Sequence, residues 1–391
     1  MSVASGPVGG RRERARRVLI AGAGVAALEA LLALRYLAGA RVSVDLLAPT
    51  PDFVLRPFAV VEPFGAAETP RLSLGGVVRE LGAGHVFDRV VAVAPEQYLV
   101  RGASGDEYGY EALIVAIGAR VVDALPGALS FPAPDAAARY RELLGELERG
   151  EVREVVFAVP ADTAWALPLY ELALLTAAWL FERGVAGARL TLVTPERAPL
   201  AAFGERASDT VAELLDRHGV DLRSGVLPRA VGEGALVLGD DLTLACERVV
   251  ALARPAGPAL EGLPSDAAGF VPVDEYGRVP GVPDVYAAGD VTAWPIKQGG
   301  LAAQQADAVA ESLATWAGAA VRPTAFRPVL RGVLLTGGTP AFLRADSRPH
   351  HARSFARLTP LWWPPAKVAG RYLAPYLAAR GIVLPETGEP T

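Results

Sequence analysis

Short apolar runs alternate along this chain with longer stretches in which apolar residues recur. Residues 18–21 form one such run, and two glycines separate it from a second apolar stretch at 25–38. Continuous short runs are typical of strands buried on both faces, and longer stretches are typical of helices. The pattern therefore predicts a strand, a helix and, at 41–49, a second strand, as in a parallel α/β sheet.

The next segment, residues 85–120, has the pattern of a β-meander. Its strands are predicted at 90–93, 98–101 and 113–116, with turn residues such as 102–105 between them. The last strand leads into a glycine turn at 118. A charged helix at 135–150 is expected to lead out of the first domain.

A second α/β unit follows, with the same alternation of apolar runs and helical stretches. Its strands are predicted at 155–159, 189–194 and 249–252, and its helices at 167–181 and 208–218. The fold class expected is α/β, with two Rossmann-like three-layer domains, each with a β-meander, and a small C-terminal α+β segment. The domains are predicted at 16–150 and 255–325 for the first, discontinuous unit, 151–254 for the second, and 326–391 for the C-terminal segment.

The C-terminal segment begins with a predicted hairpin, 329–336 and 341–345, around Gly337 and Gly338. A basic loop with His350, His351 and Arg353 follows, and then an amphipathic helix that opens at 361 and is kinked near 375. Paired tryptophans beside such a helix suit a membrane interface. A helix that closes the core or makes a dimer contact is the favoured alternative.

The composition mainly excludes certain partners and kinds of site. The 391 residues are 51% hydrophobic and 21% charged, which describes a globular chain with room for two or three domains. The net charge of −5 argues against nucleic acid as a partner. A single cysteine, Cys246, excludes an internal disulfide or a Cys-x-x-Cys centre and is expected in a buried strand. The histidine spacing indicates no metal site.

The basic start of the chain, residues 11–17, resembles that of a signal peptide. The apolar run after it contains a glycine turn and the charged residues Glu29 and Arg35, which argue against a signal peptide and against a membrane-spanning helix. A cytoplasmic location is expected, with attachment to the inner face of the membrane left open.

Almost every basic residue is arginine. The two lysines, Lys297 and Lys367, stand out in an arginine-rich, alanine-rich chain. We interpret them as positions that need a compact ammonium group and not a guanidinium fork, with chance as the alternative.

The candidate chemistry begins at the glycine turn, which reads Gly22-Ala-Gly24-Val25-Ala26-Ala27. The first glycine permits a tight turn, and the second leaves the backbone open to a pyrophosphate. The small residue at 27 allows close contact between helix and strand. The helix N-terminus offers free N–H groups to phosphates. These residues predict a dinucleotide site.

Two nearby features bear on that site. The second strand ends at Ala48, where an acidic residue would bind the ribose hydroxyls, and Asp45 lies too far back to replace it. The loop at 53–58 carries one charge, Arg56, among aromatic and apolar residues. It either packs on the sheet or places Arg56 near a cofactor, and we predict Arg56 as a cofactor-binding residue.

The corresponding turn of the second unit, residues 160–168, contains no glycine. Without glycine the backbone cannot approach a pyrophosphate in the usual way, and Trp165 would crowd it. The second site has either lost nicotinamide binding or binds the nucleotide by another route.

Further along, a short apolar strand delivers Gly289 and Asp290 at its carboxyl end. A carboxylate there can accept hydrogen bonds from a polyol such as the ribitol of a flavin, and a helix N-cap is the structural alternative. The stretch Lys297-Gln298-Gly299 then precedes a helix at 301–316. Its N-terminus and Lys297 would stabilise negative charge on a reduced flavin.

Together these stretches resemble the flavin-dependent pyridine nucleotide–disulfide oxidoreductase superfamily, over residues 17 to about 345. The glycine turn, the segment Ala116-Ile117-Gly118 and the segment ending in Gly289-Asp290 match its three FAD segments in order. The resemblance implies FAD as cofactor and Asp290 as the residue that holds the ribitol.

Within the superfamily the chain resembles type II NADH dehydrogenases and sulfide:quinone oxidoreductases. Gln304-Gln305 is similar to the end of a glutamine motif in the former, although Gly300 replaces its first glutamine. The stretches 295–299, 192–196 and 157–160 are more like the latter. The cysteines that attack sulfide in those enzymes have no counterpart here.

The function expected is that of an FAD-dependent oxidoreductase, which passes electrons from a small donor to a quinone-like acceptor. The cofactor supplies the redox chemistry, and Lys297 is the candidate catalytic residue. The alternatives are an NAD(P)H dehydrogenase with an atypical nicotinamide site and a non-catalytic flavin-binding protein. Homodimerisation and peripheral membrane contact through the C-terminal segment are left open.

Overall fold

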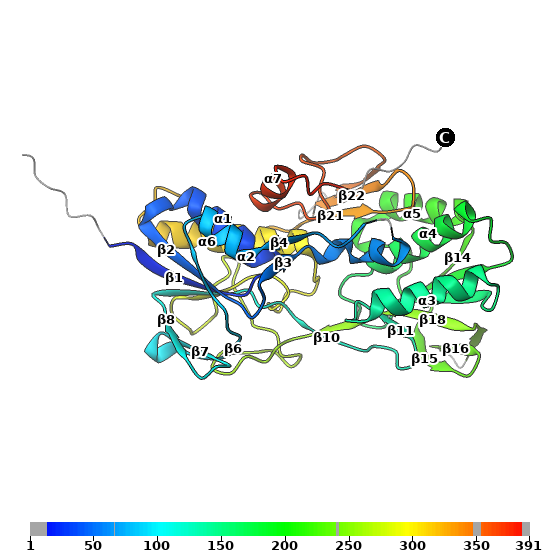
Figure 1. The fold of residues 1–391 in the computed structure, drawn as a ribbon, viewed down its shortest axis with the longest axis horizontal. Coiled ribbons are helices and arrows are strands. Elements are labelled where there is room, and N and C mark those ends of the chain that lie inside the picture. The colour runs from blue at the N-terminus through cyan, green and yellow to red at the C-terminus, as the bar shows by residue number, and fades with distance from the viewer. Residues whose placement is uncertain (1–13, 66, 240–241, 347–352, 385–391) are drawn as a thin grey trace, which may run out of the picture.

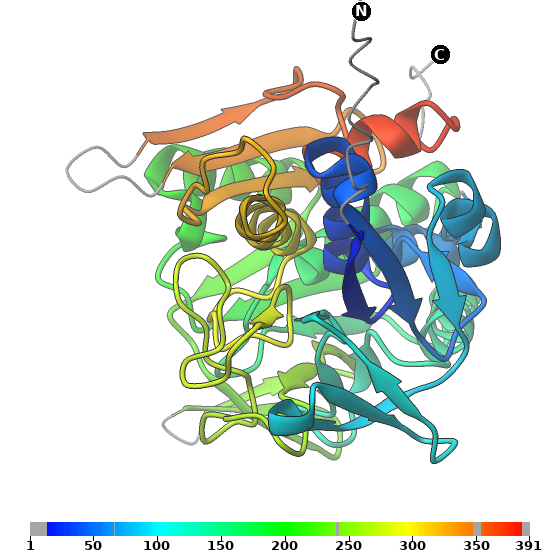
Figure 2. The same ribbon diagram turned by 90° about the vertical axis from the view of Figure 1, so that its left-hand side faces the viewer.

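Figure 1 shows the fold in a computed structural model that describes residues 14–65, 67–239, 242–346 and 353–384. Two parallel sheets lie side by side along the long axis, and a small C-terminal sheet lies over them (Figures 1 and 2). The two Rossmann-like units and the C-terminal α+β segment expected from the sequence are confirmed. No helix among the described residues is long and apolar enough to span a bilayer.

The first sheet has the strand order β20-β9-β1-β2-β5, and all its strands are parallel. Along β1, Val18 and Ile20 face the helices, while Leu19 and Ala21 face the meander. Both faces are buried, which is why the strand reads as a continuous apolar run. The strands are β1 (Arg16–Ala21), β2 (Val42–Leu47), β5 (Gly84–Val86), β9 (Ala112–Val115) and β20 (Val285–Ala287).

Two long helices, α1 (Val25–Leu37) and α6 (Gly299–Trp316), pack side by side on one face of this sheet (Figure 2). The opposite face carries the meander β6-β7-β8. The smaller elements are η1 (Gly39–Arg41), β3 (Asp52–Val54), η2 (Arg56–Phe64), β4 (Arg71–Ser73), α2 (Leu74–Glu80), β6 (Val90–Ala94), η3 (Pro95–Gln97), β7 (Leu99–Gly102) and β8 (Glu107–Gly109).

The second sheet has the order β11-β18-β12-β13-β14 and is also parallel. Helices cover one of its faces, and the meander β15-β16-β17 covers the other. Its elements are β11 (Leu129–Phe131), α3 (Ala136–Glu148), β12 (Glu154–Ala158), α4 (Leu167–Glu182), β13 (Arg189–Thr194), η4 (Ala201–Phe203), α5 (Glu205–Arg217), β14 (Val220–Ser224), β15 (Pro228–Gly232), β16 (Ala235–Leu238), β17 (Thr243–Ala245) and β18 (Arg248–Leu252).

The boundary between the two units differs from the expected one at residue 150. The chain crosses between the sheets at β10 (Arg120–Val122), and it returns at β19 (Arg254–Ala256), which pairs antiparallel with β10. β11 already pairs with β18 of the second sheet, and α3 packs into the second unit's core. A three-residue strand has too little pattern to be recognised in a sequence, and α3 lies on the second unit's side of the crossing and not on the expected side.

The expected first meander also needs a correction. Residues 113–116 are not its third strand, because β9 lies between β1 and β20 in the parallel sheet. The third meander strand is β8, which pairs with β7. The apolar run of β9 marks it as a strand buried on both faces, and the polar β8 is half solvated.

The C-terminal segment forms the sheet β21-β22-β23 and one short helix. The hairpin of β21 (Val329–Leu334) and β22 (Ala341–Asp346) is antiparallel as predicted, and β23 (Arg353–Arg357) adds a strand that was not predicted. The predicted helix from 361 is reduced to α7 (Leu373–Ala378), since Pro364 and Pro365 prevent regular helix before it. His350 and His351 lie outside the described residues.

The C-terminal helix α7 is held by a carboxylate of the first domain. Glu29, in α1, is completely buried and accepts hydrogen bonds from the backbone N–H groups of Tyr372 and Leu373, each at 2.7 Å. Asp307, on the neighbouring helix α6, lies against the same carboxyl group. Burial and the charge of Glu29 raise the pKa of Asp307 to about 9, and burial also raises the pKa of Glu29. The two carboxyl groups therefore share a proton at neutral pH.

Asp307→Asn is expected to stabilise the protein at alkaline pH. The folded state holds a proton on Asp307 up to about pH 9, whereas the unfolded chain releases it near 3.8, so stability falls as pH rises through this interval. The variant should raise the free energy of unfolding by roughly 1–3 kcal/mol at about pH 8 and flatten the pH profile. Urea unfolding across pH measures this. Asp209→Asn, on the exposed side of α5, is the matched control, and an unchanged slope in Asp307→Asn would contradict the shared proton.

Candidate functional site

The three segments with glycine motifs meet at the carboxyl edge of the first sheet. Gly22 follows β1, Ala116 follows β9 and Gly289 lies two residues beyond β20. Backbone hydrogen bonds join them: the Ala116 N–H donates to Ala21 O at 2.7 Å and the Ala288 N–H to Val115 O at 3.0 Å. Parallel α/β sheets bind ligands at this edge.

The glycine turn shows why each small residue is needed. Gly22 has a φ of +127°, and a Cβ there would lie 2.2 Å from Ala116 O, so the turn packs directly on the end of β9. Gly24 is the N-cap of α1, and a Cβ there would meet no atom within 4 Å. Ala27 is fully buried, and Ala26 lies 3.0 Å from a Cβ placed on Gly289. The motif thus packs the turn tightly at Gly22, Ala26 and Ala27 and leaves the side of the turn at Gly24 free of protein atoms.

The second segment, Ala116-Ile117-Gly118, borders the same open region. Gly118 has a φ of +74°, and a Cβ there would also meet nothing within 4 Å. Val25 begins α1, and its side chain lies 3.8 Å from a Cβ placed on Gly299 at the start of α6. The starts of α1 and α6 therefore lie beside each other, and both helices direct N-termini to this edge.

Asp290 is the carboxyl group of this edge. Burial raises its pKa, and the charges of Lys297 and Arg56 oppose that rise. Arg56, at the exposed start of η2, is therefore close enough to Asp290 for its charge to act on that carboxyl group. The N-cap alternative for Asp290 is excluded, because Gln298 caps α6.

Lys297 lies in a confined position beside Asp290. Its Nζ donates to Thr292 O and lies 3.6 Å from the centroid of the Phe270 ring. Burial lowers the pKa of Lys297 to about 8, although Asp290 and Asp266 favour the charged form. An ammonium group with this pKa can change charge near neutral pH, as a group that holds or moves a proton must.

Gln298 has a structural role through its side chain. Its Oε1 accepts from the Leu301 N–H at 2.8 Å, and its Nε2 donates to Arg331 O at 2.9 Å, which ties α6 to β21. Gly299 and Gly300 follow this cap as the first two residues of α6. A cofactor would therefore contact Gln298 or Gly299 through their backbone groups at the helix N-terminus.

The glutamine pair on α6 connects the site to the rest of the fold. Gln305 Oε1 accepts from the Gly289 N–H at 2.7 Å, and its Nε2 donates to Thr292 Oγ1 at 3.2 Å. Gln304 Nε2 donates to Val329 O at 3.0 Å. Gln305 thus fixes the loop that carries Asp290, and Gln304 fixes the C-terminal sheet. Both roles depend on long-range contacts, so the sequence pattern alone gave no signal for them.

The residues at this edge fit a flavin adenine dinucleotide. Two glycines leave open space at a helix N-terminus and at the end of β9, and a half-buried carboxyl group faces the same edge. Ala48, at the end of β2, supplies no side-chain acceptor for a ribose, and its carbonyl lies 3.3 Å from His85 Nε2. The chain thus offers groups suited to a pyrophosphate and a ribitol, whereas an adenosine ribose would find no acid at the usual position.

The carboxyl edge of the second sheet has a different character. A cavity of about 340 Å³ lies between the turn after β12, the loop after β13 and Ile296 of the first unit. Trp165 packs on Phe203 with ring centroids 5.6 Å apart, and Glu196 follows β13. Glu196 stands where an acid ends the second strand of a dinucleotide fold, and its position after an apolar strand is the sequence signal for it.

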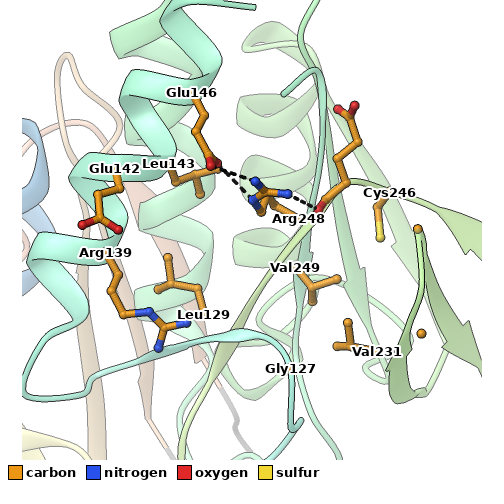
Figure 3. Close-up of a pocket in the computed structure, with 13 residues that line it drawn as sticks. Gly127, Leu129, Arg139, Glu142, Leu143, Glu146, Val231, Cys246, Arg248 and Val249 are labelled. Atoms are coloured by element: carbon orange, nitrogen blue, oxygen red, sulfur yellow. Dashed lines mark hydrogen bonds and ion pairs between the residues drawn. The ribbon is translucent and has the colours of Figure 1, made fainter. Parts of the chain in front are cut away.

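A second cavity, of about 370 Å³, lies away from both carboxyl edges. Figure 3 shows it between α3 and the strands β15 and β18, at the amino end of the second sheet. Arg248 pairs with Glu146 through two hydrogen bonds of 2.7 and 3.0 Å. Cys246 lies beside it, and burial raises the pKa of its thiol. The prediction of a buried cysteine is confirmed.

Comparisons with known proteins agree with this geometry. The model of the pyridine nucleotide-disulphide oxidoreductase family matches residues 172–316. The NADH dehydrogenase-like proteins MT1860 and Rv1812c of Mycobacterium tuberculosis are 33% identical over 241 residues, which is 57% of this chain. That match spans 58% of the length of each relative.

Solved structures share the fold. The sulfide:quinone oxidoreductase of Aquifex aeolicus has a TM-score of 0.80 at 19% identity, over 88% of this chain and 87% of that one. The ferredoxin reductase of Rhodopseudomonas palustris has a TM-score of 0.65 at 20% identity, over 85% and 82%. NDH2 of Plasmodium falciparum, in complex with NADH, has a TM-score of 0.58 at 16% identity, over 71% and 65%.

Residues 172–316 thus match the model of the pyridine nucleotide-disulphide oxidoreductase family, and the chain shares its fold with the solved structures named above. The resemblance predicted from the glycine turn and the Gly289-Asp290 segment is confirmed. Among the residues that the structure describes, no group of His, Cys, Asp or Glu side chains could hold a metal ion.

Proposed function

We propose that this chain binds FAD at the carboxyl edge of its first sheet and passes electrons from a small donor to a quinone or a similar acceptor. The observation that carries the proposal is the meeting of three separate glycine segments with Asp290 at one edge, under two helix N-termini. The flavin would supply the two-electron chemistry.

Each residue at the edge has a role in this proposal. Gly22 and Gly24 admit the pyrophosphate to the N-terminus of α1, and Asp290 accepts hydrogen bonds from the ribitol hydroxyls. Lys297, beside Asp290 and at the approach to α6, stabilises negative charge on the isoalloxazine ring. Val25, Ala26, Ala116, Ile117 and Gly118 form the wall around the same region.

The first experiment is reconstitution of the purified chain with FAD, followed by its absorbance spectrum after gel filtration. We expect the flavin bands to elute with the protein. Anaerobic mixing with NADH, NADPH or sulfide, and then with a soluble quinone, identifies the donor. A chain that retains no flavin after reconstitution would overturn the proposal.

An NAD(P)H dehydrogenase is the second candidate, and the NADH dehydrogenase-like relatives favour it. In that case NADH or NADPH bleaches the flavin band rapidly in the anaerobic experiment. A non-catalytic flavin-binding protein is the third candidate, which the turn without glycine at 160–168 favours. Steady turnover with any donor and a quinone excludes it.

Lys297→Met is expected to lower the midpoint potential of bound flavin by roughly 30 mV, because that is the effect of about 1.4 kcal/mol on a two-electron couple. The variant removes a partly buried positive charge and keeps the length of the side chain. In the wild type this contribution should fade above pH 8, where Lys297 loses its proton. An anaerobic titration against a reference dye measures the potential. Lys297→Arg, which keeps the charge, is the control, and an unchanged potential in Lys297→Met would remove Lys297 from this role.

Peripheral membrane contact through the C-terminal segment remains part of the proposal. Trp363 is 87% exposed and Leu358 is 52% exposed, whereas Trp362 packs against Phe342. An exposed tryptophan on a loop that ends in Pro364 and Pro365 suits an interfacial contact. Dimerisation is the alternative use of the same surface.

A further inference from the structure

The cavity at the carboxyl edge of the second sheet is suited to a ligand other than a dinucleotide. All its lining residues are apolar except Asp162, Thr163 and Glu196. With about 340 Å³ it lies at the small end of the range for ligand pockets. Its walls combine the aromatic pair Trp165 and Phe203 with Ile296. The cavity therefore has the room and the walls for a small aromatic molecule.

The backbone around the cavity gives a pyrophosphate little to bind. Pro160 lies two residues beyond β12 in place of a glycine, and Pro168 in the first turn of α4 has no N–H to donate. The Leu169 N–H already donates to Ala166 O at 3.0 Å. The glycines and free N–H groups at the edge of the first sheet thus have prolines and a paired N–H group as their counterparts here.

The charge of the cavity is negative. Asp162 and Glu196 are its ionisable residues, and its lining contains no lysine or arginine. Glu196 is held in place, because its carboxylate accepts from Tyr170 Oη at 3.1 Å, from Thr194 Oγ1 at 3.2 Å and from the Ala201 N–H at 3.1 Å. Burial and the charge of Glu196 raise the pKa of Tyr170, which therefore remains a donor. A phosphate group that entered this cavity would find carboxylates and no basic side chain in the lining.

The cavity is next to the proposed flavin site. Ile296, which contributes to its wall, precedes Lys297 in the loop that leads to α6. A ring in this cavity would thus lie between the second sheet and the loop that carries the candidate catalytic lysine. The position is suited to a substrate of the same reaction.

We propose that this cavity binds a small planar aromatic molecule that carries no negative charge, and that it excludes nicotinamide dinucleotides. The role of this molecule as a substrate rests on the proposed FAD function, whereas its binding does not.

Three probes of matched size test the charge preference: benzylamine, benzyl alcohol and benzoate. They share one ring and are cationic, neutral and anionic at neutral pH. Calorimetric titration of the full chain, with and without FAD, should show benzylamine and benzyl alcohol binding at least tenfold more tightly than benzoate. NADH should give no heat of binding. Equal binding of benzoate, or binding of NADH, would overturn the proposal.

Two variants locate the site. Glu196→Gln should weaken benzylamine and bring benzoate within about threefold of benzyl alcohol, because one carboxylate is neutralised. Glu142→Gln, at the second cavity, is the matched control and should change none of the three. Ala164→Phe, which fills the cavity, should abolish binding of all three probes while circular dichroism shows a folded chain. Retained binding in Ala164→Phe would place the probes elsewhere.

The outcomes separate the two proposals. Ring binding by a chain that retains no FAD would leave the cavity assignment standing and overturn the flavin function. A chain that binds FAD but prefers benzoate, or binds NADH, would overturn the cavity assignment and leave the flavin function standing.

Discussion

Lys367→Met is expected to destabilise the protein by about 3–5 kcal/mol, the cost of leaving one member of a buried ion pair without its partner. Lys367 and Glu171 form that pair, and their side chains are 4% and 1% exposed. Lys367 Nζ also donates to Val333 O at 3.1 Å, and Glu171 accepts from the Leu335 N–H at 2.9 Å. The pair therefore joins α4, β21 and the segment before α7. The loss is a large fraction of the 5–15 kcal/mol that stabilises a typical domain.

The physical cause is desolvation. Burial raises the pKa of Glu171 and lowers that of Lys367. The charge of each residue opposes this effect by favouring the ionised form of the other. Lys367→Met removes the cation and leaves a carboxylate that must be protonated or solvated in the core. Urea unfolding followed by circular dichroism measures the change.

A double variant separates the charge from the packing. Lys367→Met with Glu171→Leu removes both charges and should recover most of the lost stability, since apolar residues often replace a buried ion pair at no cost. Arg149→Ala, which breaks the exposed pair with Glu151, is the control and should have little effect. Equal stability of Lys367→Met and the wild type would show that the pair contributes nothing.

Gly24→Ala is expected to abolish tight FAD binding and to leave the fold intact. The added Cβ would meet no protein atom within 4 Å, and Gly24 has a φ of −87° that alanine adopts without strain. The methyl group would occupy the open side of the turn, where the pyrophosphate must approach the backbone. We expect a loss of affinity of at least about 100-fold, or about 2.7 kcal/mol, measured by flavin fluorescence on titration of the FAD-free chain.

Gly22→Ala provides the contrast. Its Cβ would lie 2.2 Å from Ala116 O, and its φ of +127° is unfavourable for alanine, so this variant should lose stability as well as FAD. Gly39→Ala, at a surface turn with a φ of +55° and no atom within 4 Å, is the control for a lost glycine outside the site. Tight FAD binding by Gly24→Ala would contradict the placement of the pyrophosphate.

Both lysines of the chain prove to be enclosed by the fold. Lys367 pairs with Glu171, and Lys297 contacts Thr292 and the Phe270 ring. This agrees with the interpretation that lysine is kept where a compact ammonium group is needed. The partners themselves could not be predicted, because Glu171 and Lys367 are 196 residues apart in the sequence.

The sequence by itself determined the elements whose pattern is local. The apolar run of β1, the glycine turn after it and the Gly289-Asp290 segment predicted a dinucleotide fold, because a strand buried on both faces and a tight turn each impose their own residue types. The C-terminal hairpin of β21 and β22 was predicted for the same reason.

Only the tertiary structure decided which of these elements pair and what their polar residues contact. β11 joins the second sheet through three residues, β9 lies between β1 and β20, and Gln305 holds the loop of Asp290. The cavity beside Ile296 exists because that loop is brought to the edge of the second sheet. Such contacts arise between segments far apart in the chain, where burial and charge depend on the partner that packing supplies and not on the neighbouring residues.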